Sequence, residues 1–195
     1  MAASGVVSIV PLTPDRLEDL AAVFDQPGDP KWCWCASFRI TQNVKSRPPA
    51  ENRAVLEAAS ERRPPGLIAY RAADSAPVGW VSLGPRADYV KLAKLKVFAP
   101  VDDRPVWSIV CFVVARAERG QGVARELLAA AIEYARAEGA MTLEAYPADA
   151  RGKRLHIADA YKGTLSMFER AGFAVVARRR WSATTVERLT VRLEL

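Results

Sequence analysis

The stretch VCFVVARAERGQGVARELLAAAIEYARAEG, residues 110–139, passes from an unbroken apolar run through a charged turn into a periodic segment. Apolar residues at nearly every position predict a central strand covered on both faces, which we expect over residues 106–114. Apolar side chains recur at helical spacing beyond the turn and predict an amphipathic helix that ends near Gly139. Two glycines, Gly120 and Gly122, stand where the strand gives way to the helix.

The composition is that of an ordinary globular chain with a basic surface. Its 195 residues are 50% apolar and 26% charged, which suits one sizeable core, so we expect a single domain over residues 1–195. The net charge of +6 favours anionic partners, such as a phosphorylated ligand or nucleic acid. We find no signal peptide and no apolar stretch of membrane-spanning length, and therefore expect a cytoplasmic chain without membrane contact.

The cysteines indicate neither a disulfide framework nor a metal site. Cys33, Cys35 and Cys111 are too few and too unevenly spaced for a set of disulfides. The single histidine, His156, does not complete a zinc shell with them. We therefore expect reduced thiols and no bound metal, and we expect His156 to be an exposed loop residue.

Further elements can be read along the chain. Strands are predicted over residues 6–12, 66–72, 77–83, 141–146, 173–181 and 187–195, and helices over residues 13–25, 49–63 and 162–172. Together with the opening stretch this gives the order β-α-α-β-β-β-α-β-α-β-β. The order predicts a mixed α/β domain with two N-terminal helices and one parallel crossover through the long helix.

The turn between the central strand and the long helix has the features of a phosphate site. A helix N-terminus exposes unpaired N–H groups and carries partial positive charge. Gly120 and Gly122 leave this end unobstructed and permit a positive φ, while Arg119 adds a permanent charge. A Walker loop is excluded because its G-x-x-x-x-G-K-[ST] pattern is missing, and a dinucleotide fingerprint is excluded because Arg125 stands at its third glycine.

The same stretch resembles the GNAT superfamily, the acetyl-CoA-dependent N-acetyltransferases. Their signature after a central strand is [RQ]-x-x-G-x-[GA], which Arg119, Gly122 and Ala124 fill. The segment MFERAGF, residues 167–173, is similar to a helix-and-strand element of that family, and the order of elements agrees along nearly the whole chain. The resemblance implies one mixed sheet whose central strand splays from its parallel neighbour, and acetyl-CoA as co-substrate.

The resemblance also implies which residues contact the cofactor. The pantetheine arm would lie in the splayed gap against strand backbone, and the pyrophosphate would lie on the N–H groups of the turn. The residues implied are Phe112, Val113, Val114, Arg119, Gly120, Gln121, Gly122, Val123 and Ala124. A backbone N–H near Val114 is the expected donor to the oxyanion of the reaction.

The implied reaction is direct attack of a primary amine, of a small molecule or a protein, on the thioester within one ternary complex. It needs a base and is helped by an acid. The tyrosine that often serves as the acid is replaced by Phe168, so we expect Tyr161, Tyr146 or solvent to take its place. Glu144 shares a strand face with Tyr146 and is the candidate base, the alternative being an ordinary surface glutamate.

The acceptor pocket in this superfamily is usually walled by the loop between the first two helices, which here carries Trp32 and Trp34. Their rings either contact an amine substrate or simply pack. An N-acetyltransferase, acting as monomer or homodimer, is the first interpretation. Because Phe168 cannot donate a proton, the second interpretation is a catalytically weak acyl-CoA-binding regulatory protein. The net charge of +6 allows a third, a nucleic-acid-binding protein.

Overall fold

The computed structural model describes residues 7–27, 30–149, 157–180, 182 and 185–195. The strands in these ranges are β1 (Val7–Pro11), β2 (Gly66–Arg71), β3 (Pro77–Pro85), β4 (Trp107–Val114), β5 (Thr142–Ala145), β6 (Ala148–Asp149), β7 (Ala174–Arg179) and β8 (Glu187–Glu194). The α-helices are α1 (Leu17–Phe24), α2 (Pro30–Cys33), α3 (Pro49–Ser60), α4 (Val90–Lys94), α5 (Val123–Ala137), α6 (Ile157–Ala160) and α7 (Leu165–Arg170). Short 3-10 turns are η1 (Pro14–Arg16), η2 (Ala36–Phe38), η3 (Val44–Ser46), η4 (Arg86–Asp88), η5 (Lys96–Phe98) and η6 (Arg116–Glu118).

The strands join in one mixed sheet. Its order is β1-β2-β3-β4-β5-β8. Strand β7 pairs with the edge of β8 opposite β5, and the two-residue β6 pairs with the first residues of β8. The pair β4 and β5 is parallel and its connection runs through α5, whereas the other paired strands are antiparallel. This confirms the mixed sheet with one parallel crossover that the order of elements predicted.

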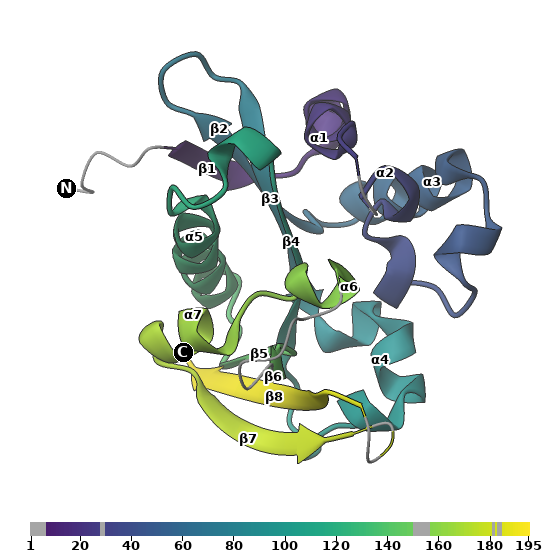
Figure 1. Ribbon diagram of the computed structural model, residues 1–195, viewed down its shortest axis with the longest axis vertical. Helices are drawn as coiled ribbons and strands as arrows, with labels where there is room; N and C mark the ends of the chain where they lie inside the picture. The colour runs from purple at the N-terminus through teal and green to yellow at the C-terminus, as the bar shows by residue number, and fades with distance from the viewer. Residues whose placement is uncertain (1–6, 28–29, 150–156, 181, 183–184) are drawn as a thin grey trace.

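Helices cover both faces of the sheet (Figure 1). On one face α5 and α7 pack over an apolar cluster that includes Phe112 and Leu127. On the other face α1 to α3 pack over a second cluster that includes Val113 and Trp80. Successive side chains of β4 therefore enter different cores, as expected for a strand buried on both faces.

Strand β4 parts from β5 halfway along its length. The parallel ladder ends at the pair Ile109–Ala145, whereas antiparallel pairing with β3 continues as far as Val114. Consecutive residues of β3 pair with Ile109 and Cys111, so that Val110 is the extra residue of a β-bulge. The structure thus contains the splayed parallel pair that the resemblance implied.

The structure differs from the sequence prediction where elements are short. The first helix begins as the 3-10 turn η1, and Thr13 before it makes no side-chain capping bond. No element was predicted between residues 83 and 106, where the structure contains η4, α4 and η5, each too short to produce a periodic signal. Among the helices of the described ranges, none has both the length and the apolarity needed to span a bilayer.

The close packing of β2 on β3 at Gly66 generates a prediction. A Cβ at Gly66 would lie 2.1 Å from the Val81 carbonyl oxygen and 2.5 Å from the Trp80 ring. We expect Gly66→Ala to lower the free energy of unfolding by about 3 kcal/mol, measured by urea denaturation, because the sheet must shift to make room. At Gly84 a Cβ would lie 3.5 Å from the Asp88 carboxylate, an ordinary contact, so Gly84→Ala is the control. Equal losses in the two variants would contradict this explanation.

Candidate functional site

The turn between β4 and α5 leaves the N-terminus of the long helix open. Gly120 and Gly122 have φ of 81° and 91°, in the region that favours glycine. A Cβ at Gly120 would meet no described atom within 4 Å, and one at Gly122 would meet the Nη2 atom of Arg125 at 3.6 Å. Since α5 begins at Val123, its first N–H groups have no carbonyl partner one turn earlier in the helix. They are accessible to an anionic group.

Side chains of the turn brace it against the strand. The Nε atom of Arg119 donates to the carbonyl oxygen of Val114 at 3.1 Å, and the Nε2 atom of Gln121 donates to the carbonyl oxygen of Ala117 at 2.9 Å. The end of β4, the turn and the start of α5 are therefore tied into one unit. Arg119 positions the turn in addition to supplying positive charge there.

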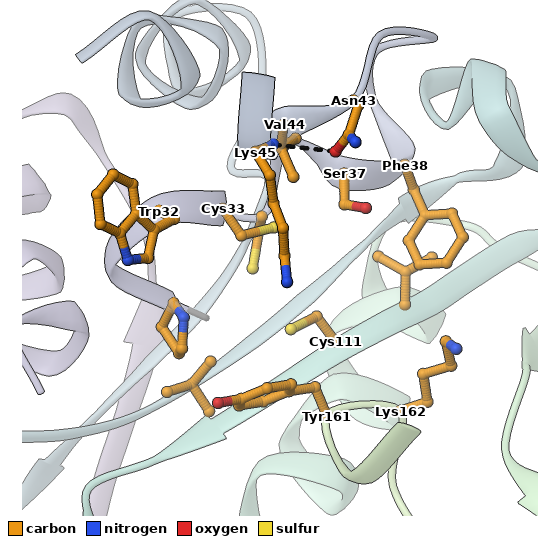
Figure 2. Close-up of a pocket in the computed structure, with 14 residues that line it drawn as sticks. Trp32, Cys33, Ser37, Phe38, Asn43, Val44, Lys45, Cys111, Tyr161 and Lys162 are labelled. Atoms are coloured by element: carbon orange, nitrogen blue, oxygen red, sulfur yellow. Dashed lines mark hydrogen bonds between the residues drawn. The ribbon is translucent and has the colours of Figure 1, made fainter. Parts of the chain in front are cut away.

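A cavity of about 250 Å³ lies over the bulge of β4, on the face covered by α1 to α3 (Figure 2). The strand contributes Val110, Cys111 and Val113, because a bulge turns two successive side chains to the same face. The other residues around the cavity are Pro30, Trp32, Cys33, Cys35, Ser37, Phe38, Asn43, Val44, Lys45, Tyr161 and Lys162. The cavity is therefore walled by the loop region after α1, where the acceptor pocket was predicted to lie, and closed by the segment that carries Tyr161.

A buried amide joins two segments of the cavity wall. Asn52 on α3 is fully buried, and its Nδ2 atom donates to the carbonyl oxygens of Trp32 at 2.8 Å and Val44 at 2.9 Å. The Oδ1 atom of Asn43 accepts the N–H of Lys45 at 3.0 Å. These bonds fix the backbone of α2 and of η3 relative to α3.

Tyr161 lies where β4 leaves β5. Its carbonyl oxygen accepts the N–H of Phe112 at 2.6 Å, and its side chain lies beside Cys111 in the cavity (Figure 2). The N–H of Phe112, which we predicted to face the cofactor, thus has a partner within the chain. Phe168 is fully buried, with its ring 6.1 Å from that of Phe112 and 5.2 Å from that of Phe173. Phe168 is therefore a core residue at the position where the family often has its tyrosine acid.

Lys162 lines the cavity although the sequence pattern did not indicate it. Its Nζ atom lies 3.0 Å from Asp159 Oδ1 and 5.7 Å from the centre of the Phe98 ring. Burial lowers the pKa of Lys162, and the charge of Asp159 opposes that shift. Only the fold brings this lysine to the cavity, since it follows Tyr161 in an unremarkable polar segment.

All three cysteines line the cavity. The Sγ atom of Cys35 accepts the Trp80 indole N–H at 3.1 Å. The hydrogen bond between the thiols of Cys35 and Cys111 lowers the pKa of Cys35 and raises the pKa of Cys111. Cys111 is half-buried and faces the cavity, which its apolar strand did not predict. Within the described ranges no group of three or more His, Cys, Asp or Glu side chains is arranged to hold a metal.

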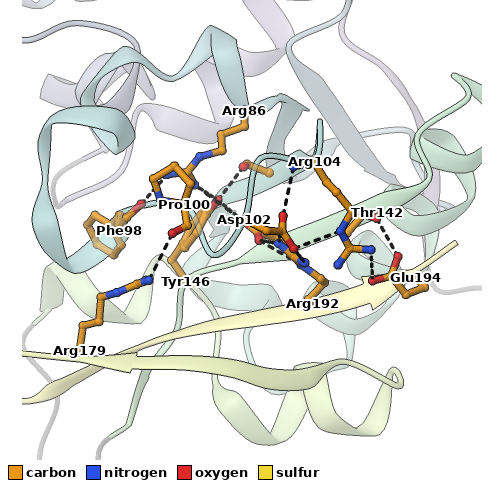
Figure 3. A network of polar contacts seen from close by, with 12 residues as sticks. Arg86, Phe98, Pro100, Asp102, Arg104, Thr142, Tyr146, Arg179, Arg192 and Glu194 are labelled. Atoms are coloured by element: carbon orange, nitrogen blue, oxygen red, sulfur yellow. Dashed lines mark hydrogen bonds and ion pairs between the residues drawn. The ribbon is translucent and has the colours of Figure 1, made fainter.

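Glu144 and Tyr146 belong to a separate charged cluster, in which Figure 3 shows Tyr146 near Asp102 and Arg192. Glu144 accepts a bond of 2.6 Å from Arg192 Nη2 and one of 3.0 Å from the Tyr146 hydroxyl, which is also hydrogen-bonded to Ser108 Oγ at 2.7 Å. Neither residue lines the cavity. Glu144 is 1% exposed, so the alternative of a surface glutamate was wrong. Its role as base stays a prediction, with both carboxylate oxygens engaged by neighbours.

Arginines neutralise this cluster. Arg192 Nη1 lies 2.6 Å from Asp102 Oδ2, and the hydrogen bond from Arg192 holds the pKa of Asp102 well below its usual range. Arg86 donates to the Tyr146 hydroxyl at 2.5 Å and also to the carbonyl oxygen of Phe98. Burial raises the pKa of Tyr146. Removing one partner would leave a buried charge uncompensated. The ion pairs of Arg192 therefore hold β8 to β5 and to the loop that carries Asp102.

Only one of the two predicted tryptophans faces the cavity over the bulge. Trp32 is 53% exposed and lines it. Trp34 is 8% exposed, and its ring packs edge-on against Phe24 at 5.3 Å, with the Arg53 guanidinium over the ring at 5.1 Å from its centre. The packing alternative thus describes Trp34, and contact with a substrate amine stays a prediction for Trp32.

Comparison with known proteins gives both a family match and similar folds. Residues 31–173 match the model of the acetyltransferase (GNAT) family. The crystal structure of mosquito arylalkylamine N-acetyltransferase like 5b is similar with a TM-score of 0.66 at 14% identity, covering 97% of this chain and 100% of that chain. Drosophila melanogaster polyamine N-acetyltransferase is similar with a TM-score of 0.63 at 11% identity, covering 97% and 100%. A chain of the NatC complex bound to Gag peptide and CoA has a TM-score of 0.59 at 16% identity, covering 98% and 99%. At these identities the likeness concerns the fold alone, and no curated protein sequence matches the chain significantly.

The pairing of Asp102 with Arg192 generates a pH prediction. A carboxyl whose pKa is lower in the folded state than its unfolded value of about 3.9 stabilises the fold above that pH, and this contribution is lost as pH falls toward the folded pKa. Between about pH 5 and pH 2 the wild type should therefore lose more free energy of unfolding than Asp102→Asn, measured from urea midpoints. Asp103→Asn is the control and should follow the wild type. Parallel curves for the wild type and Asp102→Asn would contradict the prediction.

Proposed function

Because this chain belongs to the acetyltransferase (GNAT) family, we propose that it transfers the acetyl group of acetyl-CoA to a primary amine by direct attack within one ternary complex. The observation that carries the proposal is the end of the parallel ladder at Ile109–Ala145, beside a cavity over the bulge and just before an open helix N-terminus. Two proteins of similar fold are amine N-acetyltransferases by name, which supports an amine as acceptor. We also propose that residues 1–195 work as one domain, since one sheet extends from β1 to β8.

The turn after β4 fits a pyrophosphate group. Its glycines leave open space above the helix N-terminus, and the net charge of +6 favours a polyanionic ligand. The N–H groups from Arg119 to Ala124 would hold the pyrophosphate, those of Arg119 and Gln121 only after they leave the backbone carbonyl oxygens that they contact at 3.5 and 3.4 Å. The backbone of Val113 and Val114 would hold the pantetheine arm. Phe112 would join them once the Tyr161 carbonyl has moved off its N–H. Acetyl-CoA supplies the acetyl group as an activated thioester.

Tyr161 is the proposed proton donor to the departing thiolate. Its side chain lines the cavity at the start of the gap, whereas Phe168 is a core residue. The acceptor nitrogen loses two protons in all, one before it attacks and one after the N–C bond has formed. As the C–S bond breaks, Tyr161 protonates the thiolate, and the second proton from nitrogen restores the Tyr161 hydroxyl through solvent. Among the described residues around the cavity none is Asp, Glu or His, so solvent would take the ammonium proton. The oxyanion donor expected near Val114 stays a prediction.

Binding of the cofactor can be tested at Gly122. Its φ of 91° resembles the 80° of Gly139, which lies beyond the other end of α5. Valine at either position should lower the free energy of unfolding by about 1 to 3 kcal/mol, because the backbone is strained. Only Gly122→Val also obstructs the helix N-terminus, so we expect it alone to raise the Kd for acetyl-CoA about tenfold or more by titration calorimetry. Wild-type protein that binds no acetyl-CoA, or equal Kd values for both variants, would refute the proposed site.

The acid can be tested by removing one hydroxyl. We expect Tyr161→Phe to lower kcat about tenfold with an unchanged KM for acetyl-CoA, because a thiol with a pKa near 8.5 leaves with little help. In the wild type, kcat should fall at high pH as Tyr161 loses its proton, and this fall should be absent in Tyr161→Phe. Tyr134→Phe makes the same change beside Trp107, away from the cavity, and should be neutral. A wild-type kcat and pH profile in Tyr161→Phe would remove Tyr161 from the mechanism.

A further inference from the structure

Two thiols meet in the wall of the cavity over the bulge. Cys111 follows the bulge residue of β4, Cys35 is the residue before η2, and both line the cavity. Cys111 packs against the apolar cluster that contains Cys35 and Trp80, and the two thiols share a hydrogen bond. Segments far apart in the sequence therefore hold two sulfur atoms together beside one small space.

The backbone at Cys35 is held in a strained conformation. Trp34 and Cys35 have φ of 46° and 49°, in the left-handed region that residues with a Cβ rarely adopt. Such strain persists only where the surroundings hold it, and it is concentrated at functional sites. The Cys35 side chain is held by the Trp80 indole, whose N–H donates to its Sγ atom at 3.1 Å. Backbone and side-chain contacts thus fix this thiol at one place in the cavity wall.

The two thiols are chemically unequal. The hydrogen bond with Cys111 lowers the pKa of Cys35 against the effect of burial, and the Trp80 indole and the Arg39 charge act in the same direction. The same hydrogen bond, together with burial, raises the pKa of Cys111. Cys35 therefore loses its proton first. Because the thiolate is the nucleophilic form, Cys35 is the attacking sulfur and Cys111 is the thiol beside it.

We propose that Cys35 and Cys111 form a reversible oxidation site, at which a small hydroperoxide converts the two thiols to a disulfide that closes the cavity to the acetyl acceptor. Formation of the disulfide depends on the two thiols alone. Closure of the cavity to an acceptor rests on the proposed function, because it concerns the same site.

The oxidation balances with hydrogen peroxide as the oxidant. The Cys35 thiolate attacks one peroxide oxygen, the O–O bond breaks, and hydroxide leaves while Cys35 becomes a sulfenic acid. That hydroxide deprotonates Cys111, whose thiolate attacks the Cys35 sulfur, so that the S–S bond forms and the S–O bond breaks. The second hydroxide takes up the proton that Cys35 had released. The two thiols thus lose two electrons and two protons, and one peroxide becomes two molecules of water.

The new bond would join two walls of the cavity. Cys35 precedes η2, whose Phe38 lines the cavity, and Cys111 lies on β4 beside Tyr161 (Figure 2). A covalent bond holds two sulfurs closer than a hydrogen bond does, so the wall and the strand are drawn together around a volume of only about 250 Å³. Because a small displacement of the acceptor costs rate, we expect kcat/KM for an amine to fall about tenfold or more on oxidation.

The test treats the reduced full chain with hydrogen peroxide and stops the reaction with catalase. The intact mass should fall by about 2 Da, the mass of two hydrogen atoms, and dithiothreitol should restore it. Cys35→Ser and Cys111→Ser should each prevent the bond, whereas Cys33→Ser, which removes the third thiol of the cavity wall, should retain it. Melting temperatures show whether each variant is folded, and Cys111→Ala repeats the test with a side chain that cannot hydrogen-bond.

The outcomes distinguish the inference from the function. A disulfide that disappears in Cys33→Ser, one that joins two chains, or a sulfinic acid formed without any disulfide would overturn the oxidation site. Acetyl transfer to 2-phenylethylamine and agmatine is followed in the reduced and oxidised protein by the loss of thioester absorbance, and equal kcat/KM values would overturn the closure of the cavity. Failure of the reduced protein to bind acetyl-CoA would refute the proposed function, whereas the mass measurements would still decide the oxidation site.

Discussion

The parting of β4 from β5 is the constraint on which the rest of the site depends. Strands within a sheet satisfy their N–H and C=O groups through their neighbours, so a strand that loses one neighbour must find other partners. The ladder between β4 and β5 ends at Ile109, and three residues later the N–H of Phe112 bonds to the carbonyl oxygen of Tyr161. A segment from outside the sheet thus replaces the missing strand, and the same segment brings a phenol and an ammonium group to the cavity.

Polar contacts hold β4 and β5 together next to the point where their ladder ends. Ser108 on β4 pairs with Glu144 on β5, one rung before the ladder ends, and the Tyr146 hydroxyl bonds to both side chains. Arg192 on β8 fixes the Glu144 carboxylate from the opposite side. Above this point β4 follows β3 and the two apolar cores, while β5 stays with β8. Glu144 and Tyr146, whose catalytic roles stay predictions, therefore lie at the apex of the splayed pair.

Much of this could be predicted from sequence, because order of elements and turn chemistry are local properties. The glycine turn, the central strand and the crossover helix were found in this way. A bulge inside a uniformly apolar strand leaves no signal, so the shared face of Val110 and Cys111 could not be predicted. Nor could the partner of Glu144, which lies 48 residues away. Trp32 and Trp34 are only two residues apart, yet Trp32 is exposed, whereas Trp34 has a φ of 46° and its ring is buried in the core.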